Sequence, residues 1–239
     1  MKYFSLIVPA HNEERYIAKT LEKIVALDYP KEKYEVLVVE NASTDNTYQE
    51  AKRFEGQNKA NLRVFSAPVK GVSAAKNFGI DRLATQSDWV VFLDADTLLE
   101  ASFLKNLSAF LADEKNQRKN YSVGTTQVMP LSPKFVARFW FAIYDFGHRV
   151  TRTSYAIQIF RRPLLGQLRF DEKMVLGEDL KLIGQALDYG RFFYFPTTEV
   201  YTSTRRFEQE GWLKVFFHWT FVAALPPKLQ RRFGYKVVR

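Results

Sequence analysis

Short apolar runs alternate with amphipathic segments along the first part of the chain. The runs are rich in β-branched and aromatic residues and end in polar ones, as is typical of strands buried on both faces of a parallel sheet. Between them, apolar residues recur at helical spacing. The pattern predicts strands at Phe4–Pro9, Glu35–Val39, Leu62–Ser66 and Trp89–Leu93, and helices at Glu13–Leu27, in the residues leading to Phe54, and at Ser73–Leu83.

The second part of the chain is less regular. Its segment Phe135–Arg152 is rich in aromatic residues and gives no clear assignment. Elsewhere the pattern predicts helices at Leu98–Leu111 and Gly177–Leu187, a charged loop at Asp113–Asn120, and strands at Ser122–Val128, Ala156–Phe160 and Phe192–Phe195. Because strands that alternate with helices form βαβ units, we predict an α/β fold with a mostly parallel central sheet flanked by helices.

Polar clusters follow three of the predicted strands and begin at His11, Glu40 and Asp94. The carboxyl ends of parallel strands meet at one edge of the sheet, where open α/β proteins bind their ligands. We therefore expect the clusters to converge on one ligand site, and we expect Asn12 to be the N-cap of the first helix.

The pair Asp94 and Asp96 allows two interpretations. If the chain stays extended beyond Leu93, both carboxylates project to the same side and can bind a hard cation or a hydroxyl group. Alternatively, both are turn residues, and Asp96 with Thr97 starts the next helix. This strand alone does not decide between the two.

The composition excludes several kinds of site. The chain has 239 residues, no cysteine and three histidines, so disulfides and thiolate chemistry are excluded and a zinc site is not expected. The net charge of +9 favours anionic partners, and eight basic residues against two acidic ones lie from Arg205 to Arg239. The absence of cysteine favours a reducing, cytoplasmic location. We find no signal-peptide pattern, and no apolar run approaches the length of about 20 residues that a membrane-spanning helix needs.

Five clusters together resemble the family 2 glycosyltransferases. None is specific alone, but they occur in order and with suitable spacing from about Ser5 to Trp212. They are Val8–Glu13 (with Pro9 and Asn12), Glu40–Thr47, Gly71–Gly79 (with Lys76 and Asn77), Asp94-Ala95-Asp96 and Gly177-Glu178-Asp179.

The resemblance implies a Rossmann-like GT-A domain at residues 1–211, with a nucleotide-sugar-binding half at about 1–97 and an acceptor half at about 98–211. Such enzymes move a sugar from a nucleotide diphosphate, here expected to be UDP, to an acceptor hydroxyl with inversion, usually with Mn²⁺ or Mg²⁺. By analogy, Asp96 ligates the metal and Asp94 holds the ribose or the metal's water shell. Oxygen ligands suit both ions.

The resemblance also implies donor contacts by Pro9, Asn12, Glu13, Glu40 and Lys76. Glu40 stands where the family commonly has Asp against the nucleobase, and Lys76 stands where it usually has Arg. A lysine can meet a phosphate, but without the bidentate fork of an arginine.

The family position of the catalytic base maps to Asp179, with Glu178 beside it. Inversion by direct displacement needs one base, opposite the leaving group, that takes the proton of the acceptor. Without the resemblance, the two acids would be interpreted as favourable first-turn residues of the following helix.

Arg205 and Arg206 resemble a family segment that lies near the donor diphosphate. They stand in Ser203–Phe207, shortly before Gly211-Trp212. A clamp on the phosphates and ordinary surface charge are both open interpretations.

Residues 212–239 are predicted to form a separate tail. Trp212–Leu225 is apolar and aromatic, and basic residues follow the break at Pro226-Pro227. Such a segment could lie on the anionic inner surface of a membrane. Alternatively, it could pack on the core or on another subunit. The aromatic segment Phe135–Phe146 would be either core or an acceptor-side wall that faces lipid or sugar.

The leading hypothesis is an inverting, metal-dependent transferase that acts on a glycan or lipid-linked acceptor in cell-surface glycan or glycolipid synthesis. A polyprenyl-phosphate sugar synthase would need extra basic residues near Asp179. A GT-A-like nucleotidyltransferase generally has a glycine-rich loop with Arg or Lys after the first strand, and Ala10–Glu13 has neither. The presence of all three acids, Asp94, Asp96 and Asp179, argues against a non-catalytic binding module. Nucleic acid is not an expected partner, because no groove-reading motif accompanies the positive charge.

Overall fold

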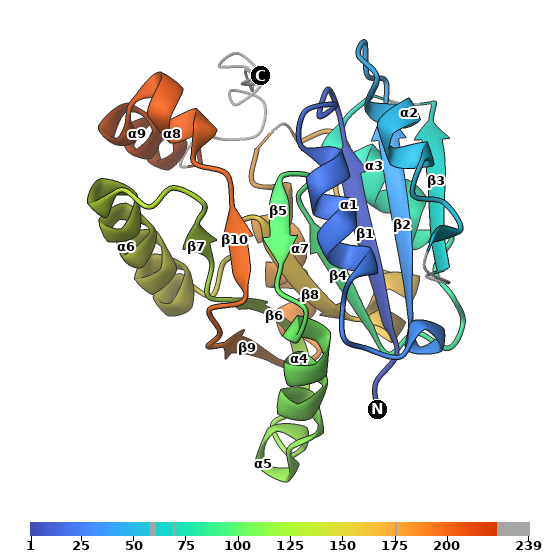
Figure 1. Ribbon diagram of the computed structural model, residues 1–239. Coiled ribbons are helices and arrows are strands. Elements are labelled where there is room, and N and C mark those ends of the chain that lie inside the picture. Colours follow the sequence, from blue (N-terminus) through green and yellow to red (C-terminus); the bar gives the residue numbers. More distant parts are fainter. Residues whose placement is uncertain (58–60, 69, 175, 224–239) are drawn as a thin grey trace.

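The computed structural model describes residues 1–57, 61–68, 70–174 and 176–223 (Figure 1). Within these residues, the central sheet has seven strands in the order β3-β2-β1-β4-β8-β6-β9. Its strands are β1 (Phe4–Ala10), β2 (Tyr34–Asn41), β3 (Asn61–Ala67), β4 (Trp89–Leu93), β6 (Tyr121–Thr126), β8 (Ile157–Arg161) and β9 (Arg191–Phe195). Only β8 runs against its neighbours β4 and β6, so the predicted α/β class with a mostly parallel sheet is confirmed.

The apolar runs form the inner strands because helices cover both faces of the sheet. Leu6 and Val8 of β1 pack in one core cluster with helix α1 (Ile17–Val25), whereas Ile7 packs in a second cluster on the opposite face. Helices α3 (Val72–Ile80) and α7 (Glu178–Leu187) contribute to that second cluster. Each buried aliphatic side chain contributes about 1.5–3 kcal/mol of transfer free energy, which fixes the strand register.

The register brings the predicted polar clusters to one edge of the sheet. In β1 and β2, Ala10 lies opposite Glu40, and in β1 and β4, Ile7 lies opposite Phe92. The chain therefore leaves all three strands at the same end, just before His11, beyond Asn41 and at Asp94.

A small second sheet corrects one predicted helix. Within the described residues it consists of β5 (Thr97–Leu99), β10 (Val200–Thr202) and β7 (Met129–Pro130). Leu98 and Leu99 therefore pair with β10, and helix α4 (Phe103–Ala112) begins later than predicted. Local periodicity could not reveal this pairing, because the partner strand lies about a hundred residues away. The interpretation of Asp96 and Thr97 as a helix start is wrong.

The first helix also begins later than predicted. Asn12 adopts φ 57°, residues 13–16 form a turn, and the N-cap of α1 is Tyr16. The prediction of Asn12 as N-cap is therefore wrong, since its side chain is engaged with a neighbouring loop. Helix α2 (Thr47–Lys52) follows β2 as predicted, and the short helix α5 (Glu114–Gln117) interrupts the predicted charged loop.

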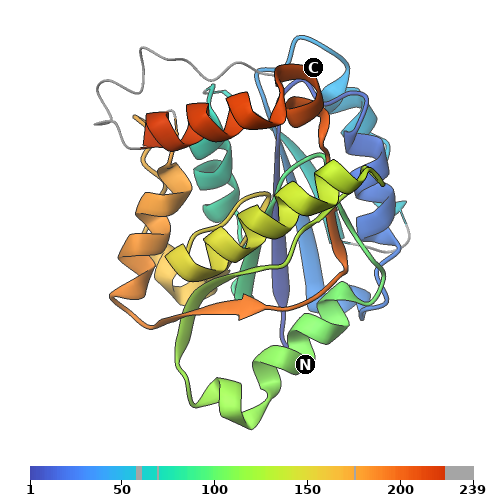
Figure 2. The ribbon, with the colours of Figure 1, turned by 90° about the vertical axis from the view of Figure 1, so that its left-hand side faces the viewer.

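The unassigned aromatic segment forms the long helix α6 (Phe135–Thr151). Figures 1 and 2 show α6 on the same side of the molecule as α8 (Arg205–Glu210) and α9 (Trp212–Ala223). Short 3₁₀ turns complete the described elements at Lys31–Lys33 and Arg162–Gly166. Residues 224–239 of the predicted tail lie outside the described residues.

No helix in the described part of the chain combines the length and the apolar character needed to cross a bilayer. The longest of the helices given above, α6, carries Arg138, Asp145 and Arg149 along its length. Its buried face contributes Ala137 and Phe141 to the core.

His148 of α6 is expected to make stability depend on pH. Its ring stacks on Tyr155 at 4.8 Å between centroids, and burial lowers its pKa to about 4. The folded protein then binds fewer protons than the unfolded chain between pH 4 and 6.5, so the free energy of unfolding should fall by about 1 kcal/mol on acidification to pH 5.5. Denaturant unfolding of the wild type and of His148→Gln at pH 7.5 and 5.5 measures this. An equal pH dependence in both proteins would contradict the prediction.

Candidate active site

The end of β4 turns sharply at the two aspartates. The Thr97 amide donates to the carbonyl oxygen of Asp94 at 3.0 Å, which closes a turn over Asp94–Thr97. Thr20 of α1 holds this turn from the side, because its Oγ1 donates to the carbonyl oxygen of Ala95 at 2.7 Å. The extended geometry assumed for this pair is therefore wrong, and each carboxylate has its own environment.

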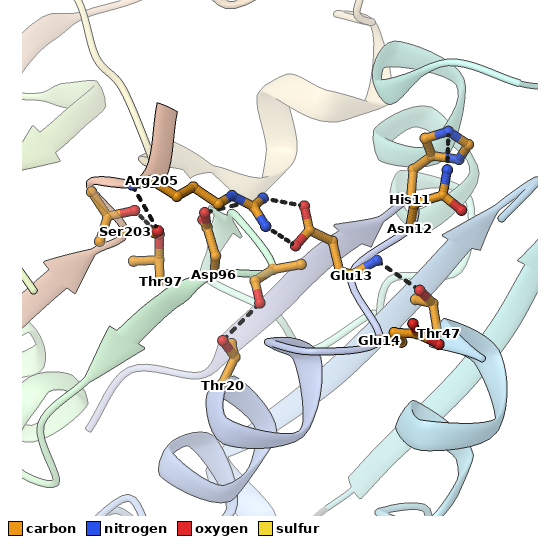
Figure 3. Close-up of polar contacts among 12 residues, drawn as sticks. His11, Asn12, Glu13, Glu14, Thr20, Thr47, Asp96, Thr97, Ser203 and Arg205 are labelled. Atoms are coloured by element: carbon orange, nitrogen blue, oxygen red, sulfur yellow. Dashed lines mark hydrogen bonds and ion pairs between the residues drawn. The ribbon is translucent and has the colours of Figure 1, made fainter. Parts of the chain in front are cut away.

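Asp96 faces a guanidinium group from the far end of the described chain. The Nη2 atom of Arg205 lies 3.3 Å from Asp96 Oδ2. The same guanidinium binds Glu13 through both nitrogens, at 2.8 and 2.5 Å (Figure 3). It also lies over the ring of Tyr16, 4.4 Å from the centroid. Arg205 thus joins the loop after β1, the turn after β4 and the start of α8.

A second cluster lies around the buried ammonium group of Lys76. Its Nζ lies 2.6 Å from Asp179 Oδ1 and 3.6 Å from Glu178 Oε1, and the side chain is 2% exposed. Gln158 of β8 completes the cluster, with Nε2 donating to Asp179 Oδ2 at 3.4 Å. Lys76 therefore fixes one oxygen of Asp179, and Gln158 contacts the other.

The pKa values of the acids reflect burial and an excess of negative charge. Burial raises the pKa of Asp94 to about 8; Lys76 opposes this rise, and Asp96, Asp179 and Glu178 increase it. Burial and the adjacent Asp179 likewise raise the pKa of Glu178. Burial alone would lower the pKa of Lys76, but Asp179, Glu178 and Asp94 outweigh it and raise that pKa well above the usual range. Three acids thus share one ammonium group, and the cluster is short of positive charge.

The two carboxylates on the Arg205 side behave in the same way. Burial raises the pKa of Asp96, against the opposing effect of Arg205. Burial also raises the pKa of Glu13, which the bond to Arg205 partly offsets. Burial favours the neutral form of Arg205, yet its contacts with Glu13 and Asp96 raise its pKa, so the guanidinium stays charged.

The predicted nucleobase side is a set of loops bound to each other. The side-chain oxygen of Asn12 accepts from the Thr44 amide at 2.8 Å. Glu40 is buried; its Oε1 accepts from the Ser43 amide at 2.5 Å and its Oε2 from Ser66 at 2.8 Å. Both carboxylate oxygens of Glu40 are thus engaged in holding the loop after β2.

The other predicted residues belong to β1 and to the first turns of α7 and α8. Pro9 is the penultimate residue of β1, paired with Val39. Arg206 follows Arg205 on α8, and its Nη1 lies 3.7 Å from Glu210. Glu178 and Asp179 occupy the first turn of α7, which begins after Gly177 at φ +79°.

Two residues of the site were missed by the sequence predictions. Gln158 contacts both Lys76 and Asp179 and is 2% exposed. An amide in the middle of an apolar strand was the signal for it. Tyr16, which packs on Arg205, gave no such signal, because an aromatic residue before a helix is equally consistent with ordinary packing.

The acids suit a divalent cation whose coordination is completed by the substrate, rather than a metal site built from protein ligands alone. In the described ranges, no three His, Cys, Asp or Glu side chains are grouped to hold a metal ion. Mg²⁺ at phosphate-binding sites commonly uses one or two carboxylates, and substrate oxygens complete the shell. Asp94 and Asp96 fit that arrangement, since both are partly buried acids whose pKa values are raised by burial despite the nearby Lys76 and Arg205.

Comparison with known proteins identifies the family and the fold of the chain. The family profile described as Glycosyl transferase family 2 matches residues 5–162. TarS of Staphylococcus aureus, named a poly(ribitol-phosphate) β-N-acetylglucosaminyltransferase, is 33% identical over 111 residues, which are 46% of this chain and 19% of TarS. A Methanococcus voltae protein, named a dolichyl N-acetyl-α-D-glucosaminyl phosphate 3-β-D-2,3-diacetamido-2,3-dideoxy-β-D-glucuronosyltransferase, is 27% identical over 198 residues, 76% of this chain and 60% of that protein.

Solved structures share the fold. The crystal structure of TarS residues 1–349 with UDP-GlcNAc matches with a TM-score of 0.70 and 26% identity, covering 86% of this chain and 59% of that one. The mannosyltransferase PcManGT from Pyrobaculum calidifontis, in complex with GDP-Man and Mn²⁺, matches with a TM-score of 0.63 and 22% identity, over 95% of this chain and 67% of that one. This chain thus spans about a fifth of the length of TarS and three fifths of that of the Methanococcus relative.

Proposed function

Since the chain belongs to glycosyl transferase family 2, we propose that it moves a sugar from a nucleotide diphosphate donor to a hydroxyl group of a cell-envelope glycan, with inversion. One observation carries the proposal: Asp94, Asp96 and Asp179 converge on one sheet edge together with Lys76 and Arg205. The relatives support the acceptor class, because TarS is named for poly(ribitol-phosphate) and the Methanococcus protein for a dolichyl-linked sugar. The TarS complex with UDP-GlcNAc supports UDP as the nucleotide.

We assign the donor diphosphate to the Asp96 side of the site, with Mn²⁺ or Mg²⁺ bound by Asp96 and Asp94. When bound, such an ion supplies positive charge for the departing diphosphate. The PcManGT complex with GDP-Man and Mn²⁺ supports the use of a divalent cation. In our proposal, Arg205 then leaves Glu13 and Asp96 and turns to the phosphates, because a guanidinium binds phosphate as well as carboxylate.

The nucleoside is proposed to lie along the loops after β1 and β2. Asn12 and Glu40 are engaged in loop contacts, so their role is to shape the wall of the nucleoside pocket, with Pro9 at its floor. Glu13 becomes available for the nucleoside once Arg205 moves. Arg206, whose charge already acts on Asp96, adds to the positive field around the phosphates.

Asp179 is proposed as the base, and Lys76 as its positioning residue. Asp179 takes the proton of the acceptor hydroxyl while that oxygen bonds to the anomeric carbon. The bond from this carbon to the phosphate oxygen breaks, and the diphosphate leaves with the electron pair. Lys76 and Gln158 hold the two carboxylate oxygens, so the base is oriented before the acceptor arrives. Glu178 supports the Lys76 ammonium from the other side.

The acceptor class also leads us to propose that the enzyme works at the cytoplasmic face of a membrane. A lipid-linked precursor or a growing envelope polymer is anchored there, and the transferase must reach it. The exposed phenylalanines and arginines of α6, in the predicted acceptor half, support this location.

Donor binding tests the function directly. UDP-GlcNAc, other UDP-sugars and GDP-mannose are titrated calorimetrically into the full chain with Mn²⁺, with Mg²⁺ and with EDTA. We expect metal-dependent binding of one nucleotide class, weakened about tenfold or more in Asp96→Asn. Asp28→Asn, which replaces an exposed acid that forms an ion pair with Lys105, is the matched control and should bind as the wild type does. If no nucleotide diphosphate binds with or without metal, the proposed transfer reaction is rejected.

A further inference from the structure

Helix α6 presents an unusually apolar face to solvent. Its exposed large side chains are spaced by four, four, three and four residues, so they form one stripe along the helix. The stripe and its exposed fractions are Phe135 (83%), Phe139 (53%), Ile143 (41%), Phe146 (68%) and Val150 (63%). Exposed phenylalanines grouped in this way mark a surface that binds another protein or a membrane.

Helix α9 extends this surface. It exposes Leu213, Phe217 and Phe221, at 61%, 65% and 55%. The two helices lie on the same side of the molecule (Figure 2), and the start of α9 packs on α6, with the rings of Trp212 and Phe141 6.5 Å apart. We call the exposed side chains of α6 and α9 the apolar face.

The exposed charged residues on or beside the apolar face are mostly basic. Arg138, Arg149, Arg152 and Lys214 are exposed on or beside the two helices. The acids nearby are turned to other groups within the described chain: Asp145 accepts from the hydroxyl of Tyr194 at 2.5 Å, Glu208 binds Lys134 at 3.1 Å, and Glu210 binds Arg206. In sequence alone, residues 224–239 contribute Lys228, Arg231, Arg232, Lys236 and Arg239 to the net charge of the chain, and no acidic residue.

We propose that the apolar face docks on the surface of an anionic lipid bilayer, with α6 lying in the plane of the interface. Charge complementarity selects this partner: aromatic and aliphatic side chains enter the headgroup boundary, while the flanking arginines and lysines meet lipid phosphates. A second copy of this chain would bring the same basic residues against each other, which costs binding energy. The inference rests on the proposed membrane location and names the surface that achieves it.

The position of the apolar face explains why docking would serve catalysis. Helix α9 directly follows α8, whose first residue is Arg205 of the donor site. The ring of Phe141 on α6 packs against Phe207 on α8, at 5.8 Å between centroids. A bilayer under α6 and α9 therefore lies beside the candidate active site, where a lipid-linked acceptor hydroxyl can reach it.

Vesicle co-sedimentation tests the proposal. The full chain is mixed with two kinds of vesicle. One contains phosphatidylcholine alone, and in the other roughly one lipid in three is the anionic phosphatidylglycerol. We expect binding to the anionic vesicles, reduced about tenfold or more in the double variant Phe139→Ser/Phe146→Ser. The matched control, Tyr189→Ser, removes an exposed aromatic residue near the end of α7 and should bind as the wild type does. In Arg138→Gln/Arg149→Gln, the preference for anionic lipid should be reduced, because two of the basic residues beside the apolar face lose their charge.

Three outcomes would overturn the membrane assignment. They are absence of vesicle binding by the wild type, equal binding by the phenylalanine variant, and a concentration-dependent dimer that the phenylalanine variant abolishes while vesicles are not bound. The far-ultraviolet spectrum and melting temperature of each variant show that it is folded. Donor binding in the same preparations separates a failure of the membrane proposal from a failure of the transfer reaction.

Discussion

Replacing Asp179 by Asn is expected to lower the rate of sugar transfer by about 10²–10⁴-fold while the donor still binds. The amide keeps the size and one acceptor oxygen of the carboxylate, but it cannot take a proton from the acceptor hydroxyl. Binding should persist because Asp179 belongs to the Lys76 cluster rather than to the Arg205 contacts that we assign to the diphosphate.

Steady-state kinetics with the donor identified by calorimetry measures kcat, and calorimetric titration of the variant measures the donor Kd. The matched control is Asp188→Asn, an exposed acid at the end of the same helix, for which both quantities should stay unchanged. Transfer at an undiminished rate in Asp179→Asn would remove Asp179 as the base. A lost donor affinity would instead show that Asp179 belongs to the donor site.

Replacing Lys76 by Met is expected to lower the free energy of unfolding by about 3–5 kcal/mol. Methionine fills a similar volume, so the loss is electrostatic: Asp179, Glu178 and Asp94 remain buried without their shared ammonium group. Lys76→Arg keeps the charge and should retain more of the stability. The larger guanidinium must then fit where the lysine side chain is only 2% exposed.

The pH dependence of this loss identifies its cause. The pKa of Glu178 is raised in the folded protein, so the folded state binds more protons than the unfolded chain, and stability falls as the pH rises through that pKa. Without Lys76 the pKa rises further, so the stability lost in Lys76→Met should be larger at pH 8 than at pH 5.5. Urea unfolding of both proteins in EDTA measures this. A loss that does not change with pH would point to packing instead.

The hydrophobic pattern predicted the part of the fold where strands are buried on both faces. In β1, β2 and β4 the apolar runs coincide with strands, and the polar residues that follow them mark the ligand edge. This works because a strand inside a helix-covered sheet has no polar face, so its ends are visible as changes in composition.

Elements that depend on distant partners could not be predicted in the same way. β5 is a strand only because β10 pairs with it, and its own sequence fits the start of a helix equally well. In α6 the inward Phe141 and the outward apolar stripe place hydrophobic residues on both faces, which obscures the helical period.

The same distinction holds for the candidate site. Asp94, Asp96 and Asp179 could be proposed from motifs, because each stands at the end of a strand or the start of a helix. Their partners could not: the contact of Lys76 with Asp179 and that of Arg205 with Glu13 join residues 103 and 192 positions apart. Such contacts follow from the tertiary fold alone.

The contact between Arg205 and Glu13 also affects how the protein folds during its synthesis. On a ribosome, Glu13 leaves the exit tunnel long before Arg205 is synthesised, so the two ends of this ion pair meet only after nearly all of the described chain is available. Closing so long a loop is entropically unfavourable until the intervening sheet has formed. A nascent or truncated chain that lacks α8 would therefore hold the partly buried acids Glu13 and Asp96 without the Arg205 guanidinium. We expect the nucleotide-binding half to reach its final state only after α8 has been synthesised and has docked, which delays activity until then.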